Sequence, residues 1–382
     1  MPPTRNRCCS VRALLVAFTL ALGSVLGPVP AQLSAADAPV GAVGSEQLVS
    51  NGDPAKRITL VLLGDGYTAA ELPRFRSQAA AVWRALTQVE PFRSYQRFFN
   101  VRRVDVVSRQ SGLRAGSPLG MRFGCEGIDR LLCADDRAVA RYAGYAGGSD
   151  GPEYLLALAN SDTYGGEGGD GLATLAAGSP DAAAIVQHEM GHTVGALGDE
   201  YDAAPADDSF PNVSAAGEES ILRERVKWWR WLGAADPTGG TVGAYRSANG
   251  LFRPTRDSIM RTLGGTYNLP CREALIESLY RQVGPIDRAE PAPQAVVGRG
   301  PLQVFPIRLT GARQLTVRWQ VDGRPAPAAA VHGTRLDTAR LGLPPGSRAE
   351  VSATVQDTTP WLRDEAFRSA RMTATVTWTV QR

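Results

Sequence analysis

Two of the three histidines of this chain lie four residues apart, in the run His188-Glu-Met-Gly-His192. Ser179 and Pro180 precede that run in an order typical of a helix start, a capping hydroxyl followed by proline at the first helical position. The sequence therefore predicts a helix from Pro180 to about Gly195. Residues i and i+4 of a helix lie on one face, about 6 Å apart along the axis. The fold must place two imidazoles side by side on this helix, where both can bind one metal ion.

The residues around this pair supply the other groups that a catalytic zinc site needs. Such a site usually has three protein ligands and one open position. Glu189 is close enough to act on a water bound to the ion rather than to ligate it. Asp199 is the expected third ligand, with Glu200 as the alternative, because both acids follow the helix closely. His332, the remaining histidine, lies much further along the chain and is not expected to contribute.

The segment after the helix allows two interpretations. In the first, Gly195 and Gly198 let the chain leave the helix and turn back beneath the metal, which brings the acids that follow to the ion. In the second, these acids form a solvated turn or a loop that binds a structural calcium ion, because calcium prefers clustered oxygen ligands. Asp202, Asp207 and Asp208 would complete that loop.

The first part of the chain after residue 57 follows a strand–helix–strand pattern. Apolar runs of strand length cover residues 58–63 and 99–107. Between them Thr68 and Glu71 have the spacing of a capping box, which predicts a helix that runs to about Val89. Apolar residues recur at helical spacing within it. This order predicts two parallel strands joined by a crossover helix that covers one face of the sheet.

The segment that follows carries further elements around the histidine helix. Strands are predicted over residues 154–159 and 172–176, and a glycine-rich loop over residues 164–170 lies between them. The 172–176 strand comes just before the histidine helix and is predicted to be the edge strand that pairs with an extended substrate. A later helix is predicted over residues 272–283, whose apolar residues share one face. Residues 58–284 therefore predict one α+β domain with a mixed sheet and the histidine helix.

The pattern changes at Pro285. Residues 285–300 are rich in Pro, Gly and Ala, which predicts a linker. Over residues 301–382 apolar and polar residues alternate, most clearly over residues 372–380. Turn sequences rich in Asp, Gly and Pro separate these stretches. The C-terminal part therefore predicts a small all-β domain, an antiparallel immunoglobulin-like sandwich.

Residues 1–31 have the three-part layout of a secretory signal peptide. Three arginines and no acid come first, an apolar stretch over residues 13–27 follows, and Val29 and Ala31 supply the small side chains of a cleavage site. The alternative, a membrane anchor, needs about 20 apolar residues, and this run is shorter. We therefore expect a bacterial protein that is secreted or periplasmic. Residues 32–57, which are mostly small and polar, are a predicted N-terminal extension of the mature chain.

Removal of the leader changes the charge balance. The whole chain has a formal charge of +3, and loss of Arg5, Arg7 and Arg12 brings that charge to zero. A mature chain near neutrality has no excess of basic residues to attract phosphate, so nucleic acid is not an expected partner. No later segment is long and apolar enough to predict a membrane span in the mature chain. We expect the mature protein to be a monomer.

Three cysteines are left after cleavage of the leader. In an oxidising compartment the close pair Cys125 and Cys133 is expected to form a disulfide. Cys271 is then left over, and we expect it to be a buried, inert thiol.

Several runs of this chain resemble one family of peptidases. Residues 188–201, His-Glu-Met-Gly-His-Thr-Val-Gly-Ala-Leu-Gly-Asp-Glu-Tyr, are similar to the active-site signature of the M64 metallopeptidases, the IgA-peptidase family. Residues 63–68 resemble the strand-to-helix entry of that family. Its segment downstream of the histidine helix is similar to residues 252–255, 258–261 and 271–273. The resemblance covers roughly residues 58–284 and implies a metzincin-like zincin fold, one zinc ion per chain and endopeptidase activity.

By position, the resemblance assigns roles to individual residues. It implies that His188 and His192 are zinc ligands, that Glu189 is the general base and that Asp199 is the third ligand. Met260 resembles the methionine of the turn beneath the metal in metzincins, and an ordinary core methionine fits the sequence equally well. In the metzincin pattern the third ligand comes one position earlier than Asp199, where this chain has a glycine.

These assignments imply a zinc-dependent endopeptidase that cleaves protein or glycoprotein substrates. Glu189 would take a proton from the zinc-bound water and pass it to the leaving amine. A second donor to the oxyanion is expected, and the candidates are Tyr201, Tyr245, Arg261 and Tyr267. Two alternatives are a zinc amidase that acts on small or cell-wall substrates, and an exported binding protein on a zincin fold that has no catalytic activity.

Overall fold

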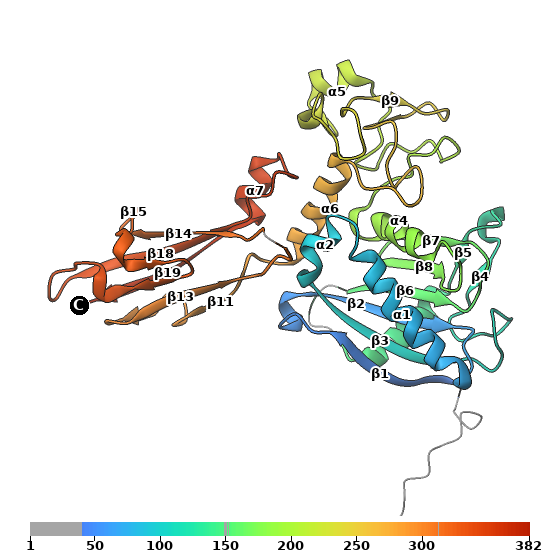
Figure 1. Ribbon diagram of the computed structural model, residues 1–382, viewed down its shortest axis with the longest axis horizontal. Helices are drawn as coiled ribbons and strands as arrows, with labels where there is room; N and C mark the ends of the chain where they lie inside the picture. Colours follow the sequence, from blue (N-terminus) through green and yellow to red (C-terminus); the bar gives the residue numbers. More distant parts are fainter. Residues whose placement is uncertain (1–39, 149–150, 152, 312) are drawn as a thin grey trace, which may run out of the picture.

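The computed structural model describes residues 40–148, 151, 153–311 and 313–382 (Figure 1). Over these residues the chain forms a mixed α/β structure with seven α-helices and five β-sheets. The expected signal peptide lies outside the described residues, as does the first part of the expected N-terminal extension. Within the described part, no helix combines the length and the apolar character that a membrane crossing needs.

A six-stranded mixed sheet forms the centre of the N-terminal part. In spatial order its strands are β1 (Gly41–Val49), β3 (Phe99–Val107), β2 (Ile58–Asp65), β6 (Glu153–Ala159), β8 (Leu172–Ala176) and β7 (Gly166–Gly169). The four inner strands run parallel to one another. β1 and β7 form the two edges and pair antiparallel to their neighbours. Because the inner strands are covered on both faces, β2, β6 and β8 read as largely apolar runs, whereas β3 also contains buried polar and charged residues such as Arg103 and Asp105.

Helices cover both faces of this sheet (Figure 1). Leu60 and Leu62 of β2 belong to the buried cluster that includes residues of two helices, α1 (Leu72–Leu86) and α4 (Ala182–Gly195). Val61 and Leu63 belong to a second buried cluster, together with residues of α3 (Asp136–Ala143). Because successive side chains of a strand point to opposite faces, α1 and α4 lie on one face of the sheet and α3 lies on the other.

The predicted crossover between two parallel strands is confirmed. β2 and β3 pair in parallel, and α1 connects them. The capping box is present, because Glu71 Oε2 accepts hydrogen bonds from the Thr68 backbone N–H at 2.9 Å and from the Thr68 hydroxyl at 2.8 Å. α1 ends at Leu86, three residues before the predicted position. The Thr87 hydroxyl donates to the Trp83 carbonyl at this end of the helix.

The edge strand next to α4 is β7, and the prediction that residues 172–176 form this edge is wrong. The glycine-rich segment folds back at Asp170 and Gly171, whose φ values are 37° and 83°, and then pairs antiparallel with β8. A two-residue hairpin turn with positive φ favours these residue types. The sequence pattern misses β7 because Gly-Glu-Gly-Gly has low strand propensity. β8 is therefore an inner strand of the sheet.

Two segments that the sequence predicts as an extension and a linker contain strands. β1 lies within residues 32–57 and pairs with β3 along most of its length. β11 (Ile286–Glu290) and β12 (Val296–Val297) lie within residues 285–300. These strands are short or polar, and their hydrogen-bond partners are strands that lie elsewhere in the sequence. The periodicity of their own residues therefore does not predict them.

The C-terminal part forms two sheets of four and five strands. Besides β11 and β12, their strands are β13 (Pro301–Pro306), β14 (Thr316–Val321), β15 (Arg324–Pro325), β16 (Val331–His332), β17 (Arg335–Asp337), β18 (Arg348–Gln356) and β19 (Thr373–Gln381). The predicted alternation corresponds to β14, β18 and β19, which pair antiparallel. Residues from both sheets share one buried cluster, in which the rings of Trp319 and Trp378 stack with centroids 5.7 Å apart.

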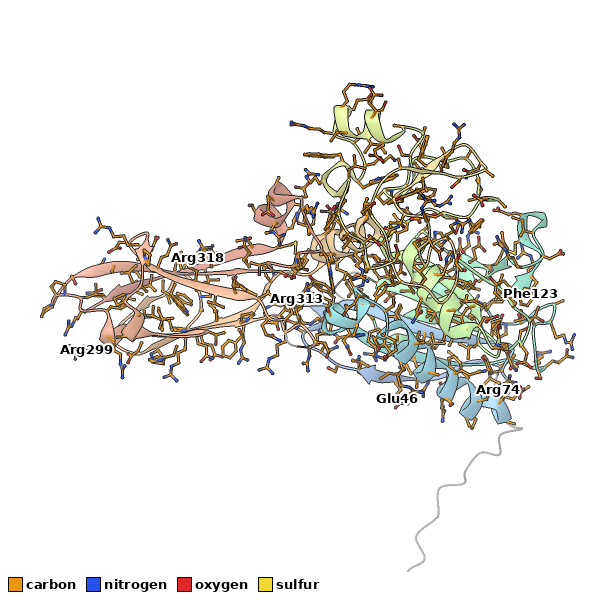
Figure 2. The ribbon with its side chains drawn as sticks, turned by 45° about the horizontal axis from the view of Figure 1, so that its top comes forward. Glu46, Arg74, Phe123, Arg299, Arg313 and Arg318 are labelled. Atoms are coloured by element: carbon orange, nitrogen blue, oxygen red, sulfur yellow. A yellow bond between two sulfur atoms is a disulfide. The ribbon has the colours of Figure 1, made fainter. Side chains whose placement is uncertain are left out.

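The C-terminal sheets join the N-terminal part through α2 (Phe92–Tyr95) and α6 (Leu269–Gln282). The Asp357 carboxylate is buried there and accepts hydrogen bonds from the hydroxyls of Tyr95 at 2.6 Å and Tyr280 at 2.8 Å. In Figure 2, Arg313 marks this junction, whereas Arg299 and Arg318 lie further out along the strands. α6 begins three residues before the predicted position because Asn268 caps it by accepting from the Cys271 N–H.

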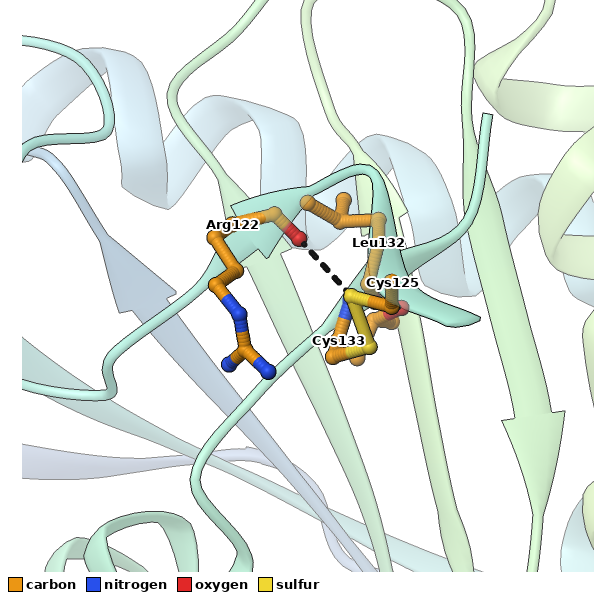
Figure 3. Close-up of a disulfide and its surroundings, with 5 residues drawn as sticks. Arg122, Cys125, Leu132 and Cys133 are labelled. Carbon is orange, nitrogen blue, oxygen red and sulfur yellow. Dashed lines mark hydrogen bonds between the residues drawn. A yellow bond between two sulfur atoms is a disulfide. The ribbon is translucent and has the colours of Figure 1, made fainter. Parts of the chain in front are cut away.

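The remaining elements are three short pieces of the fold in different places. α5 (Glu218–Glu224), β9 (Tyr245–Arg246) and β10 (Phe252–Arg253) belong to an upper layer in Figure 1. β4 (Arg122–Phe123) and β5 (Leu132–Cys133) form a small hairpin, and α7 (Glu365–Arg371) lies in the C-terminal part. The predicted disulfide between Cys125 and Cys133 is confirmed, and it closes this hairpin (Figure 3). Cys271 is a buried free thiol, as predicted.

Candidate metal centre

α4 places both imidazoles on one side, as the four-residue spacing predicts. The Nε2 atoms of His188 and His192 lie 3.2 Å apart. A backbone carbonyl fixes the orientation of each ring through its other nitrogen. The Nδ1 atom of His188 is 2.9 Å from the Ile259 carbonyl, and that of His192 is 2.6 Å from the Leu197 carbonyl. A carbonyl can only accept, so both Nδ1 atoms carry the proton and both Nε2 atoms present a lone pair. This is the tautomer that binds a metal through Nε2.

The carboxylate of Asp199 completes the group. Its Oδ1 atom lies 3.0 Å from Nε2 of His188 and 3.2 Å from Nε2 of His192. Burial raises the pKa of the Asp199 carboxyl, whereas the neighbouring imidazoles, when they are protonated, outweigh that effect and lower the pKa below the usual value. Three electron-pair donors thus face a common centre, which is the arrangement that a cation stabilises.

Glu200, the alternative third ligand, points away from the histidines. Its carboxylate is buried and accepts from Ser258 Oγ at 2.7 Å, from Asn212 Nδ2 at 2.9 Å and from Asn268 Nδ2 at 3.1 Å. Burial raises the pKa of Glu200, and these hydrogen bonds offset part of that rise. Glu200 therefore links the loop after α4, the turn around Ser258 and the start of α6. Its role is to hold these segments beneath the histidines.

The turn that contains Met260 lies directly under α4. The Glu200 N–H donates to the Met260 carbonyl at 2.9 Å, and the neighbouring Ile259 carbonyl orients His188. Met260 is fully buried. A Cβ atom at Gly191 would lie only 2.7 Å from its sulfur, so glycine at this position allows the turn to approach the helix. The Met260 side chain thus packs against the helix between the two histidines.

The chain leaves α4 through Ala196, and the prediction that the flanking glycines provide the turn is wrong. Ala196 has φ 49° and ψ 39°, a left-handed conformation. Gly195 and Gly198 are not in that region, and they serve close packing instead. A Cβ at Gly195 would lie 2.8 Å from Leu275, and one at Gly198 would lie 2.7 Å from Phe210.

We expect Ala196→Gly to raise the free energy of unfolding by roughly 0.5–1 kcal/mol, because glycine adopts the left-handed conformation without a Cβ clash. Urea denaturation of both proteins measures the change. The matched control is Ala183→Gly at an exposed position of the same helix, which should cost up to about 1 kcal/mol. A loss of stability in Ala196→Gly would contradict the assigned backbone conformation.

A cleft of about 720 Å³ opens over the candidate metal centre. His188, Glu189, His192 and Asp199 line it together with residues of β7. A Cβ at Gly166 would lie 3.1 Å from Glu189 Oε1, so this carboxylate lies beside the edge strand. Burial raises the pKa of Glu189, although the two imidazoles partly counteract this effect. Glu189 is thus next to the histidine pair and next to the edge strand of the sheet.

The glycines of β7 allow this proximity. A Cβ at Gly168 would lie 2.3 Å from the Glu189 backbone carbonyl, which no side chain can tolerate. The edge strand therefore packs directly on the backbone of α4. The glycine-rich run, which the sequence predicts as a loop, is thus the signal in the sequence for this close approach.

The four candidate oxyanion donors have different surroundings. Tyr267 is buried and its hydroxyl donates to the Gln187 carbonyl, and the Tyr245 hydroxyl donates to the Thr241 carbonyl at 2.9 Å. Only Tyr201 and Arg261 line the cleft among these four.

The acids proposed for a calcium loop are separated. Asp202 forms ion pairs with Arg261 at 3.2 Å and Arg253 at 3.5 Å, whereas Asp207 and Asp208 accept from nearby backbone N–H groups. Among the residues that the structure describes, the cluster that could hold a metal ion is the one at His188, Glu189 and His192, with Asp199 Oδ1 beside both imidazoles, and these three acids are not part of it. The geometry therefore gives no support to a calcium site.

Two further residues, Arg130 and Tyr164, line the cleft and are not predicted from the sequence. Arg130 lies in the loop between Cys125 and Cys133. Figure 3 shows the disulfide of this loop beside Arg122 and Leu132. Arg130 donates a hydrogen bond to the Tyr201 hydroxyl at 3.1 Å, although the two residues are 71 positions apart in the sequence. No local pattern marks such a contact.

Comparison with known families agrees with this arrangement. The sequence profile of the IgA peptidase M64 family matches residues 47–238, which is just over half of the chain. The matched residues include the whole of α4 and Asp199. No curated protein matches the chain significantly. This chain therefore belongs to the IgA peptidase M64 family, which implies peptidase activity on a protein substrate.

Proposed function

We propose that this protein is an exported zinc-dependent endopeptidase, in which His188, His192 and Asp199 bind zinc and Glu189 is the general base. The observation that carries the proposal is the convergence of three ligand atoms, no two of which are more than 3.2 Å apart. Four ligands about 2 Å from a tetrahedral zinc ion have a mutual spacing of about 3.3 Å. The observed spacing supports one zinc ion per chain.

The chemistry of the donors also supports zinc. Two imidazole nitrogens and one carboxylate oxygen form a ligand set that zinc accepts while it keeps one open position. Asp199 Oδ1 is buried and accepts no hydrogen bond among the described residues. A bound cation would compensate this atom, and the carbonyls behind both rings keep the nitrogen lone pairs directed at it.

The protein's own residues would carry the proton transfers. Zinc, when bound, lowers the pKa of a water and polarises the substrate carbonyl. The Glu189 carboxylate would take the proton of the attacking water and deliver it to the leaving amine. Burial raises the pKa of Glu189, which makes its carboxylate a stronger base toward the attacking water.

The edge strand supports an extended peptide as the substrate. β7 lines the cleft, is half-buried and has one free edge in the described sheet. A peptide that adds to this edge would lie beside Glu189, with its backbone held by main-chain hydrogen bonds. This geometry favours an endopeptidase over an amidase for small substrates.

We also propose a zincin domain, an immunoglobulin-like sandwich and export of the protein. The mixed sheet, α4 and the buried Met260 beneath it support a metzincin-like zincin domain. Two sheets with a shared core support an immunoglobulin-like sandwich at the C-terminus. The leader of residues 1–31 and the Cys125–Cys133 disulfide support export to the periplasm or the medium.

Metal removal tests the proposed function. We expect the purified mature chain to contain one zinc ion and to cleave unfolded casein. A chelator should abolish cleavage, and added zinc should restore it, because Glu189 alone cannot activate water sufficiently. Gel electrophoresis measures cleavage, and atomic absorption measures the metal.

The same assay distinguishes the alternatives. Hydrolysis of small amides or cell-wall peptides without cleavage of casein or of a glycoprotein would favour an amidase. Bound zinc without any hydrolysis would favour a binding protein. Absence of zinc from a protein that cleaves casein in the presence of chelator would contradict the proposal.

A further inference from the structure

The two oxygens of the Asp199 carboxylate have different partners. Oδ1 faces the histidines, whereas Oδ2 accepts a hydrogen bond from the Tyr201 hydroxyl at 2.7 Å. The Tyr201 hydroxyl in turn accepts one from Arg130 Nη2 at 3.1 Å, and the Arg130 guanidinium lies 5.5 Å from the centre of the Tyr201 ring. A continuous chain of contacts thus runs from Arg130 through Tyr201 to Asp199 and the histidine pair.

We propose that Tyr201 and Arg130 are positioning residues for Asp199, and that the loop closed by the Cys125–Cys133 disulfide completes the metal centre by presenting Arg130. This inference rests on the proposed zinc site. A carboxylate on a short side chain can rotate about its last bond, and rotation would exchange the two oxygens. A donor fixed on Oδ2 removes that freedom and leaves Oδ1 directed at the histidines.

Tyr201 is well placed for this task. Its hydroxyl has one proton, which it donates to Asp199. The lone pair of the same oxygen accepts a hydrogen bond from Arg130. A cationic donor on that oxygen strengthens the O–H as a donor to the carboxylate. The guanidinium also lies against the Tyr201 ring, which keeps the ring in place.

The position of Arg130 depends on its loop. A Cβ at Gly165 would lie 2.5 Å from the Arg130 carbonyl and 2.6 Å from the Phe123 ring, so the loop packs tightly on the start of the edge strand. Figure 2 labels Phe123 in this region. Gly124 N–H donates to the Leu131 carbonyl at 3.1 Å, and the disulfide joins the two ends of the loop. Loss of the disulfide would release the segment that carries Arg130.

The test measures zinc affinity by competition with a chromophoric chelator, and the visible spectrum of the cobalt-substituted protein. Tyr201→Phe removes only the hydroxyl, and we expect it to weaken zinc binding about 10-fold. Arg130→Ala should weaken binding about two- to fivefold, because this hydrogen bond is exposed. Both variants should change the cobalt spectrum, which reports the ligand geometry. The double variant Cys125→Ser/Cys133→Ser should reproduce the effect of Arg130→Ala.

A combined variant tests whether Arg130 acts through Tyr201. If it does, the addition of Arg130→Ala to Tyr201→Phe should cause almost no further loss of zinc affinity. The controls are Tyr245→Phe and Arg141→Ala, which change a tyrosine and an arginine outside the cleft and should leave zinc affinity unchanged. Circular dichroism and thermal melts monitor folding of every variant.

The outcomes separate this inference from the proposed function. Zinc affinity and a cobalt spectrum like those of the wild type in Tyr201→Phe would overturn the inference alone. Additive losses in the combined variant would show that Arg130 acts independently, and would overturn the proposed chain of contacts. If the wild-type chain binds no zinc, the proposed function fails first and the inference fails with it.

Discussion

Replacement of Glu189 by glutamine should reduce cleavage of casein by about 10²–10⁴-fold and leave the zinc content unchanged. Glutamine has the size and hydrogen-bonding oxygen of glutamate but cannot take a proton from water. The ligands that we propose are His188, His192 and Asp199, and Glu189 is not among them, so the metal should be retained. Steady-state rates and metal analysis of the same preparation measure both quantities.

Asp199→Ala provides the matched comparison, because it should lose both zinc and activity. The two variants together separate the proton transfer from the binding of the metal. Full activity in Glu189→Gln would exclude this residue as the general base. Loss of zinc in Glu189→Gln would indicate that Glu189 is itself a ligand.

Replacement of Asp357 by alanine should reduce the free energy of unfolding by about 2–5 kcal/mol, because it leaves the buried hydroxyls of Tyr95 and Tyr280 without an acceptor. The Asp357 carboxylate also accepts from the Thr359 N–H at 2.8 Å. These bonds connect α2 and α6 to the C-terminal sheets. We therefore expect the junction between the two parts to be the site of the loss. Urea denaturation measures the change.

A cycle of variants identifies the cause of this loss. The triple variant Tyr95→Phe/Tyr280→Phe/Asp357→Ala removes the unpaired hydroxyls, so its cost should be smaller than the sum of the separate costs. Asp162→Ala is the control for loss of an acid, because Asp162 forms an exposed ion pair with Arg74 and should cost less than about 1 kcal/mol. A small effect of Asp357→Ala would contradict the view that this carboxylate holds the two parts together.

Local patterns predicted the elements whose own residues are strongly periodic. The β2–α1–β3 crossover, β6, β8 and α4 all follow from apolar runs and helical spacing. β1 and β7 escaped prediction because their residues are polar or glycine, and their strands exist only through pairing with β3 and β8. The error about the edge strand came from the same cause, because a strand's place in a sheet depends on its neighbours.

The histidine pair and Glu189 are the part of the candidate site that spacing alone predicted. Four residues along a helix bring two side chains together whatever the rest of the fold does. The choice between Asp199 and Glu200 has a different basis. The two residues are adjacent in the chain, and the sequence predicts Asp199 as the third ligand with Glu200 as the alternative. In the structure the first faces the histidines and the second is buried among Ser258, Asn212 and Asn268.

The amino-acid order by itself thus determined the helix that carries two imidazoles and an acid, because neighbours along a helix meet at fixed intervals. Only the tertiary structure decided which carboxylate joins them, which strand borders the cleft and how Arg130 reaches Tyr201. Those contacts connect residues up to 71 positions apart, and chain geometry over such distances depends on the packing of the whole sheet and its loops. Local physics predicted the residues that we propose for the chemistry, and long-range packing determined how their side chains are oriented.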